Sequence, residues 1–202
     1  MFFSFDGIDG VGKSTQVALL ADALNDRKFE VIVCRDPGST PLGERVREIL
    51  LSKEEGTPIG RCSEMLLYMA ARAALVEQVI QPALAAGKVV IADRYLLANV
   101  VYQGHAGGLD PQEIWDVGRV ATRGLMPECI FLLDMAPGSA GNRIDRPLDR
   151  MESQGDDFRE RLRIGFLQEA TGRERIHIIA ADRPIDEVQA DIWRIAAETL
   201  RI

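Results

Sequence analysis

The segment from Gly7 to Ser14 reads GIDGVGKS, which matches the pattern G-x-x-x-x-G-K-[ST]. It follows the apolar segment MFFSF and precedes STQVALLADAL, whose apolar residues recur with a helical period. Glycines allow a tight backbone turn in which N–H groups face phosphate oxygens, and the following helix adds the positive end of its dipole. The motif therefore predicts a strand, a phosphate-binding loop (P-loop) and a helix, in that order.

Two side chains of this loop have defined chemistry in such motifs. Lys13 reaches the β- and γ-phosphates of a nucleotide, and the Ser14 hydroxyl ligates Mg²⁺. A chance match is the alternative, and the strand-like and helix-like flanks argue against it. The residues expected to bind the nucleotide are Gly7, Ile8, Asp9, Gly10, Val11, Gly12, Lys13, Ser14 and Thr15.

Short apolar runs alternate with longer amphipathic segments along the chain. The runs are mostly continuous, which is typical of strands in a sheet covered on both faces. Their alternation with helices predicts an α/β fold with a five-stranded parallel sheet flanked by helices. The expected strands are 1–5, 30–34, 88–92, 128–133 and 175–179. The expected helices lie near 13–25, 41–52, 61–86, 110–123, 137–146, 156–171 and 184–201.

The chain has 202 residues, a length typical of one domain. No linker or repeat is evident, so we expect a single domain over 1–202. The most irregular stretch is 136–157, rich in Gly, Pro, Asp and Arg, which predicts a short lid within that domain.

Three arginines in this stretch, Arg143, Arg146 and Arg150, are candidate catalytic residues. Arginines delivered by a lid can neutralise the charge that develops during phosphoryl transfer and can exclude water. We expect Arg143 and Arg146 to share a helical face, Pro147 to end that helix, and Arg150 to come from the loop beyond. The alternative is a solvated basic surface.

Composition limits the partners. The net charge is −7, so the chain lacks the basic footprint that nucleic-acid binding needs, although a small anionic ligand stays possible in a locally positive site. Three separated cysteines without a CxxC pair indicate a reducing compartment. We find no run of ~20 apolar residues and no secretory signal, and expect a cytoplasmic protein without membrane or nucleic-acid partners.

Two further constellations are candidate ligand sites. Asp93-Arg94-Tyr95 follows the apolar run VVIA, and residues at the carboxyl end of such a strand face the ligand crevice. There a carboxylate can hold Mg²⁺ and an arginine can bind a phosphate; a structural ion pair is the alternative.

Tyr68 and Arg72 would share a helical face that could stack on a nucleobase and hydrogen-bond its edge. A core tyrosine beside a surface arginine is the alternative. Asn99 and Tyr102 are likewise one turn apart if their segment is helical. The absence of a guanine-reading NKxD element favours a small-molecule kinase over a GTPase.

Five segments together resemble bacterial thymidylate kinases, in order and over residues 2 to about 195. They are FDGIDGVGKST, RDPGSTPLGERVREILL, LLYMAARAALVEQVIQPALAAG, the DRY segment through YQG, and DRMES with GDDFRERLR. The resemblance implies the P-loop nucleoside-monophosphate-kinase fold and transfer of the γ-phosphoryl group of MgATP to dTMP, giving dTDP and ADP for dTTP synthesis. It also implies a homodimer, for which the helices near 61–86 and 110–123 are interface candidates.

The resemblance assigns roles to individual residues. Asp9 would meet the sugar 3′-hydroxyl and the water shell of Mg²⁺, Arg94 would hold the dTMP phosphate, and Asp93 would lie beside the metal. Tyr68 would stack on thymine and Arg72 would hydrogen-bond one of its carbonyls. The remaining pocket residues would be Asn99 at the base edge, Tyr102 against the 2′ position, and Pro37 in the wall; by analogy, the loop 181–184 would adjoin the adenine.

Several positions depart from the usual pattern of these kinases. Gly10 stands where some members have a basic residue, and the arginine-rich lid is typical of members without one. The other departures leave tolerance for dUMP open; they are Asp6, Asp36, Ser39, Ala74, Ala98 and Gly107.

Catalysis by such a site needs no general base, because the acceptor phosphate has a second pKa of about 6 and is already a dianion at neutral pH. His105 and His177 are accordingly given no role. Two alternatives to dTMP phosphorylation stay open: another nucleoside-monophosphate kinase, or a P-loop protein that binds nucleotide without catalysis.

Overall fold

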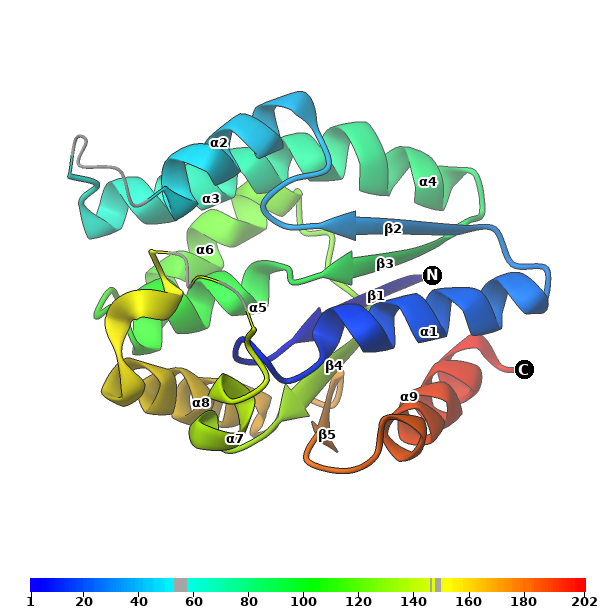
Figure 1. Ribbon diagram of the computed structural model, residues 1–202. Coiled ribbons are helices and arrows are strands. Elements are labelled where there is room, and N and C mark those ends of the chain that lie inside the picture. Colours follow the sequence, from blue (N-terminus) through cyan, green and yellow to red (C-terminus); the bar gives the residue numbers. More distant parts are fainter. Residues whose placement is uncertain (53–57, 146, 148–149) are drawn as a thin grey trace.

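A computed structural model describes residues 1–52, 58–145, 147 and 150–202 (Figure 1). Their strands form a single five-stranded sheet in the order β2-β3-β1-β4-β5, in which every pair is parallel. This confirms the predicted parallel sheet, although each strand begins one residue later than expected. The strands are β1 (Phe2–Asp6), β2 (Val31–Arg35), β3 (Val89–Asp93), β4 (Cys129–Asp134) and β5 (Ile176–Ala180).

Helices cover both faces of the sheet (Figure 1). One face carries α1 (Lys13–Asp26) and α9 (Ile185–Leu200), which pack against each other. The other face carries α3 (Arg61–Leu75), η1 (Val76–Ile80), α4 (Gln81–Ala85), α5 (Leu96–Asn99), η2 (Val100–His105), α6 (Pro111–Thr122) and α8 (Asp156–Ala170). The remaining elements are α2 (Pro41–Leu51), which packs on α3, and the short α7 (Pro137–Gly141) and η3 (Glu152–Gln154).

Local sequence explains several helix boundaries. The Asp110 side chain accepts a hydrogen bond from the Gln112 amide, and Pro111 occupies the first turn of α6, as the sequence predicts. Helix α6 ends where Arg123 and then Gly124 adopt positive φ angles. Thr40 caps α2 in the same way, through the amide of Gly43.

One helical segment differs from the sequence-based expectation, and a second is helical where the sequence left this open. The helix expected over 137–146 is wrong in extent: α7 ends at Gly141 and Arg143 lies in a turn, because glycines and Asn142 make poor helix interiors. Arg143 therefore has no helical face to share, and Arg146 lies outside the described residues. The segment after Tyr95 is helical as α5 and η2, and its apolar side chains are buried all round.

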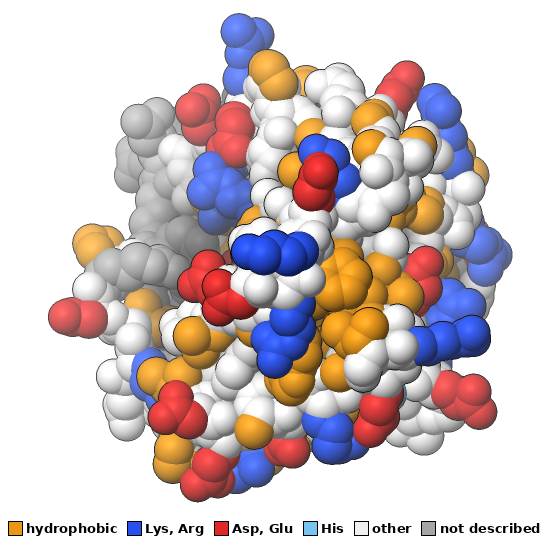
Figure 2. Space-filling view, turned by 90° about the vertical axis from the view of Figure 1, so that its right-hand side faces the viewer, with side chains coloured by type: hydrophobic (Ala, Val, Ile, Leu, Met, Phe, Trp, Pro, Cys, Tyr) orange, Lys and Arg blue, Asp and Glu red, His pale blue; other side chains and the backbone are white. Residues whose placement is uncertain are grey.

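The loops that connect the strands lie at two opposite ends of the sheet. The loops after β1, β2 and β3 meet at one end, while both chain termini lie at the other (Figure 1). On the face that carries the termini, basic and acidic side chains are interspersed (Figure 2). Because the P-loop follows β1, any site built from it must lie at the carboxyl end of the strands.

Among the described residues, no helix is both long and apolar enough to cross a membrane.

Candidate active site

The P-loop leaves the carboxyl end of β1 and enters α1 through a turn that requires glycine. Gly7 and Gly10 have φ angles of 134° and 87°. A Cβ atom on Gly10 would lie 2.1 Å from the carbonyl oxygen of Ala140 in α7, so this position also admits the close approach of another backbone. The loop conformation thus depends on α7 as well as on its own sequence.

Lys13 is buried and folds back over the loop. Its Nζ donates to the carbonyl oxygens of Ile8 at 2.8 Å and Gly7 at 3.2 Å, and lies 3.7 Å from Asp9 Oδ1. Burial, together with the nearby Arg94 charge, lowers the pKa of Lys13 to about 8, while Asp9 partly opposes that shift. This lysine therefore carries a charge that can be lost in a neutral-to-basic range.

Ser14 lies beside the end of β3. Its Oγ donates to Asp93 Oδ2 at 2.9 Å, so a hydroxyl and a carboxylate from two elements meet next to the P-loop. Oxygen donors of these kinds are those that Mg²⁺ prefers. The pair predicted from sequence as metal-binding is thus brought together.

Asp9, Arg94 and Tyr102 form a closed triangle of hydrogen bonds. Arg94 Nη2 donates to Asp9 Oδ1 at 2.5 Å and to the Tyr102 hydroxyl at 3.0 Å, and that hydroxyl donates to Asp9 Oδ2 at 2.8 Å. Arg94 Nη1 also donates to the Gly7 carbonyl at 2.9 Å. Burial alone would raise the pKa of Asp9, but Arg94 and Lys13 hold it well below its usual range.

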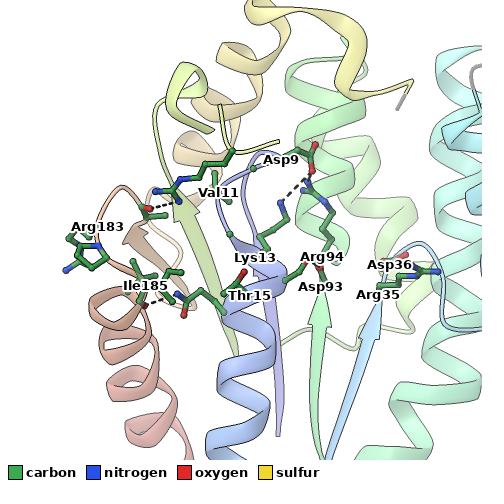
Figure 3. Close-up of a pocket in the computed structure, with 18 of the residues that line it drawn as sticks. Asp9, Val11, Lys13, Thr15, Arg35, Asp36, Asp93, Arg94, Arg183 and Ile185 are labelled. Atoms are coloured by element: carbon green, nitrogen blue, oxygen red, sulfur yellow. Dashed lines mark hydrogen bonds and ion pairs between the residues drawn. The ribbon is translucent and has the colours of Figure 1, made fainter. Parts of the chain in front are cut away.

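The backbone of Arg94 has a φ of 69°, an uncommon angle for a residue with a side chain. Such strain persists when surrounding contacts over-determine it, and it clusters at functional sites. Here the hydrogen bonds to Gly7, Asp9 and Tyr102 provide those contacts. The strained turn after β3 directs the guanidinium toward the P-loop (Figure 3).

Arg72 is the largest fully buried side chain among the described residues, with 1% of its surface exposed. Its Nε donates to Asp36 Oδ2 at 2.5 Å, and its Nη1 donates to Asn99 Oδ1 at 2.9 Å. Burial raises the pKa of Asp36, and the Arg72 charge opposes that shift. Burial of an arginine costs free energy unless its charge is paired, so the Arg72–Asp36 ion pair is strongly favoured.

Two cavities adjoin at this end of the sheet. The larger, about 820 Å³, contains the P-loop, with Lys13, Ser14 and Thr15 along one wall and Arg183 and Ile185 on another (Figure 3). The smaller, about 110 Å³, is lined by the base-pocket candidates Pro37, Tyr68, Arg72, Asn99 and Tyr102, together with others. The residues that line both cavities are Asp9, Asp36, Arg47 and Arg94.

The lid arginines lie in different places. Arg143 lines the larger cavity and donates to the Ala181 carbonyl oxygen at 3.2 Å. Arg150 instead donates to the Leu50 carbonyl oxygen at 2.7 Å and pairs with Glu64, and neither Arg150 nor Glu64 is among the described residues that line the two cavities. A contact of Arg143 or Arg150 with phosphate stays a prediction.

Sequence reasoning missed several residues of these cavities. Arg47 lines both and donates to the Pro37 carbonyl oxygen at 3.1 Å, and Gln103 lines the smaller one. Both lie within the segments quoted for the resemblance, RDPGSTPLGERVREILL and YQG. For Gln103, an amide within a mostly apolar helical segment was the available signal. Arg47 lies among other charged residues of α2, so its charge gave no distinct signal.

Comparisons with known proteins agree with this geometry. The family model described as "Thymidylate kinase" matches residues 5–192. The chain belongs to the thymidylate kinase family. Membership in the thymidylate kinase family confirms the resemblance and the P-loop kinase fold inferred from sequence.

Individual relatives are similar over almost the whole chain. A thymidylate kinase of Rhodopirellula baltica is 42% identical over 95% of this chain and 78% of its own length. One of Bifidobacterium longum subsp. infantis is 43% identical over 99% of this chain and 89% of its own. One of Symbiobacterium thermophilum is 39% identical, with coverage of 99% and 94%. The similarity to thymidylate kinases therefore spans both cavities.

Proposed function

We propose that this protein is an ATP-dependent dTMP kinase that transfers the γ-phosphoryl group of ATP to the 5′-phosphate of dTMP, giving dTDP and ADP. The observation that carries the proposal is the junction of the two cavities at Asp9 and Arg94. A donor nucleotide in one cavity and an acceptor in the other would bring their phosphates together there. Membership in the thymidylate kinase family supports the identity of both substrates.

The larger cavity suits the donor. P-loop amides and Lys13 would bind the β- and γ-phosphates, and Arg143, which lines the same cavity, would approach them. The loop containing Ala181, Arg183 and Pro184 would adjoin the adenine. Lys13 must leave the carbonyl oxygens of Gly7 and Ile8 to reach a phosphate, so binding exchanges neutral acceptors for charged ones.

Ser14 and Asp93 would hold Mg²⁺, directly or through its water shell. When bound, the ion would neutralise negative charge on the phosphates. The two side chains already lie together, because the Ser14 hydroxyl is 2.9 Å from Asp93 Oδ2.

The smaller cavity suits the acceptor. Tyr68 would stack on the base, Arg72 and Asn99 would bind its edge, and Tyr102 would crowd the 2′ position. Arg94 and Arg47, which line both cavities, would bind the acceptor phosphate. Because that phosphate is a dianion at neutral pH, alignment and charge neutralisation suffice without a general base.

We also propose the organisation that the family resemblance implies. The chain would form one kinase domain over 1–202 and act in the cytoplasm as a homodimer. Exposed apolar side chains on the two candidate interface helices support the dimer: Leu66 on α3 is 49% exposed and Val120 on α6 is 79% exposed.

The test is ADP production with MgATP across a panel of acceptors: dTMP, dUMP, dCMP, AMP and GMP. We expect dTMP to give the highest kcat/KM. A higher value with AMP or GMP would identify another nucleoside-monophosphate kinase. No ADP with any acceptor, from protein that binds ATP, would identify a non-catalytic nucleotide binder.

A further inference from the structure

A chain of side-chain hydrogen bonds runs along one wall of the smaller cavity. Arg72 Nη1 donates to Asn99 Oδ1 at 2.9 Å, and Asn99 Nδ2 donates to Gln103 Oε1 at 2.5 Å. Gln103 Nε2 then donates to Glu64 Oε1 at 2.8 Å, and Arg150 pairs with the second Glu64 oxygen. We call Arg72, Asn99, Gln103 and Glu64 the amide chain; all four are buried.

The two ends of the amide chain fix its direction. A guanidinium only donates and a carboxylate only accepts, whereas an amide can do both. Asn99 must therefore turn its oxygen toward Arg72, and Gln103 must turn its nitrogen toward Glu64. If either amide turned over, like groups would face each other in a buried place, and such unpaired polar groups are strongly disfavoured.

The two amide side chains that the amide chain orients lie in the wall of the smaller cavity. Asn99 and Gln103 both line the smaller cavity, whereas Glu64 is absent from its described lining. Each amide keeps one N–H and one oxygen lone pair outside the chain. Pyrimidines with an oxygen or an amino group at position 4 present opposite donor and acceptor orders at positions 3 and 4. An amide free to turn over could serve both orders, and a locked amide serves one.

We propose that Glu64 is a positioning residue that, together with Arg72 at the other end of the amide chain, sets the base preference of the acceptor pocket by holding Gln103 and Asn99 in one orientation. The 4-oxo base of dTMP is then accepted and the 4-amino base of dCMP is rejected. The inference rests on the proposed dTMP kinase function. Arg150 does not take part in orienting Gln103, since it pairs with the other carboxylate oxygen of Glu64.

The decisive variant is Glu64→Gln, which can donate as well as accept, so that reversed amides would meet a like group only at Arg72 and no longer at both ends of the amide chain. The quantity measured is the ratio of kcat/KM for dTMP to that for dCMP. We expect this ratio to fall at least about tenfold, because pockets that reject a base by its unpaired polar groups lose that rejection when the groups can rearrange. KM for ATP, which binds in the other cavity, should stay within about twofold.

Two controls separate orientation from a merely structural role. Arg150→Met removes the other partner of the same carboxylate and should preserve the ratio, even where kcat falls. Glu64→Asp keeps an acceptor-only group and should restore most of the ratio lost in Glu64→Gln. A parallel loss of activity toward dTMP and dCMP in Glu64→Gln, with the ratio unchanged, would overturn the proposal.

Gln103→Met keeps the proposal testable where Glu64→Gln does not fold. It removes the amide through which Glu64 acts, so the ratio should fall, and the double variant should show no further loss. A wild-type ratio in Gln103→Met would contradict the proposal. Wild-type protein that forms no ADP with dTMP would instead contradict the proposed function, whereas wild-type activity with equal kcat/KM for both acceptors would contradict this inference alone.

Discussion

The pairing of Arg72 shows how a single residue links burial to substrate choice. With its guanidinium between Asp36 and Asn99, it is held rigidly at the wall of the smaller cavity. A fixed donor at that wall can recognise a base carbonyl without paying for ordering a flexible side chain at each turnover. The same rigidity makes the residue a sensitive probe of the acceptor site.

Arg72→Ala should therefore raise KM for dTMP far more than KM for ATP. Loss of a charged hydrogen bond corresponds to about 10- to 100-fold in KM. Steady-state kinetics with each substrate varied in turn measures the effect. Arg194→Ala, in an exposed ion pair on α9, is the matched control and should change neither constant. An unchanged KM for dTMP in Arg72→Ala would refute the pocket assignment.

Lys13 predicts a pH dependence of donor binding. Its pKa is lowered from 10.5 to about 8, so the free protein loses this charge as pH rises through 8, earlier than an ordinary lysine would. The apparent Kd for ATP should rise about tenfold between pH 7 and pH 9, in proportion to the falling charged fraction. Calorimetric titration without dTMP measures it.

Lys13→Arg is the matched control, because a guanidinium stays protonated throughout this range. Its ATP affinity, whatever its level, should be flat from pH 7 to pH 9. A wild-type Kd for ATP that is equally flat from pH 7 to pH 9 would contradict the prediction that Lys13 loses its charge in this range.

At the residue scale, sequence motifs and the family resemblance name candidate site residues, whose roles stay predictions, and they miss what depends on tertiary contact. The P-loop, the Ser14–Asp93 pair and the base-pocket residues could all be named in advance. The partnership of Glu64 with Gln103 could not, because it joins positions 39 residues apart on α3 and η2. Neither residue stands out until the two helical segments are packed together.

At the scale of elements, α7 supports the P-loop through a backbone contact. Gly10→Ala should lower kcat more than tenfold and also lower Tm, because its Cβ would meet the Ala140 carbonyl oxygen at 2.1 Å. Activity assays and thermal melts of the purified variant measure both effects.

Gly172→Ala is the matched control. Gly172 also has a positive φ, 74°, but no atom of the described structure lies within 4 Å of its added Cβ. It should lose about 1 kcal/mol of stability and keep its activity. Equal activity losses in the two variants would mean that backbone strain, rather than contact with α7, is responsible.

Element boundaries were predicted well where periodicity was long and poorly where the sequence is irregular. The continuous apolar runs located every strand to within one residue. The helix expected over 137–146 failed because Gly138, Gly141 and Asn142 weaken the helix within its first two turns. The sequence does not decide the segment of α5 and η2, because its residues, Asn99 and Gln103 included, are buried almost all round and so lack an amphipathic period.

For the whole molecule, the proposed homodimer makes a prediction about surface residues. Val120→Asp would place a charge on the most exposed large apolar side chain of the described residues and should shift the protein to monomer. Analytical ultracentrifugation at several concentrations measures the change. Ile178→Asp, on β5 with 52% exposure, is the control and should leave the association state unchanged. A wild-type monomer at all concentrations would contradict the proposed dimer.

The central claim is that donor and acceptor phosphates meet where the two cavities join, at Asp9 and Arg94. The most direct test uses a bisubstrate probe, adenosine and thymidine joined through a pentaphosphate bridge. It should bind one molecule per chain and compete with both ATP and dTMP. A probe that competes with only one substrate, while the other still binds beside it, would contradict the claim.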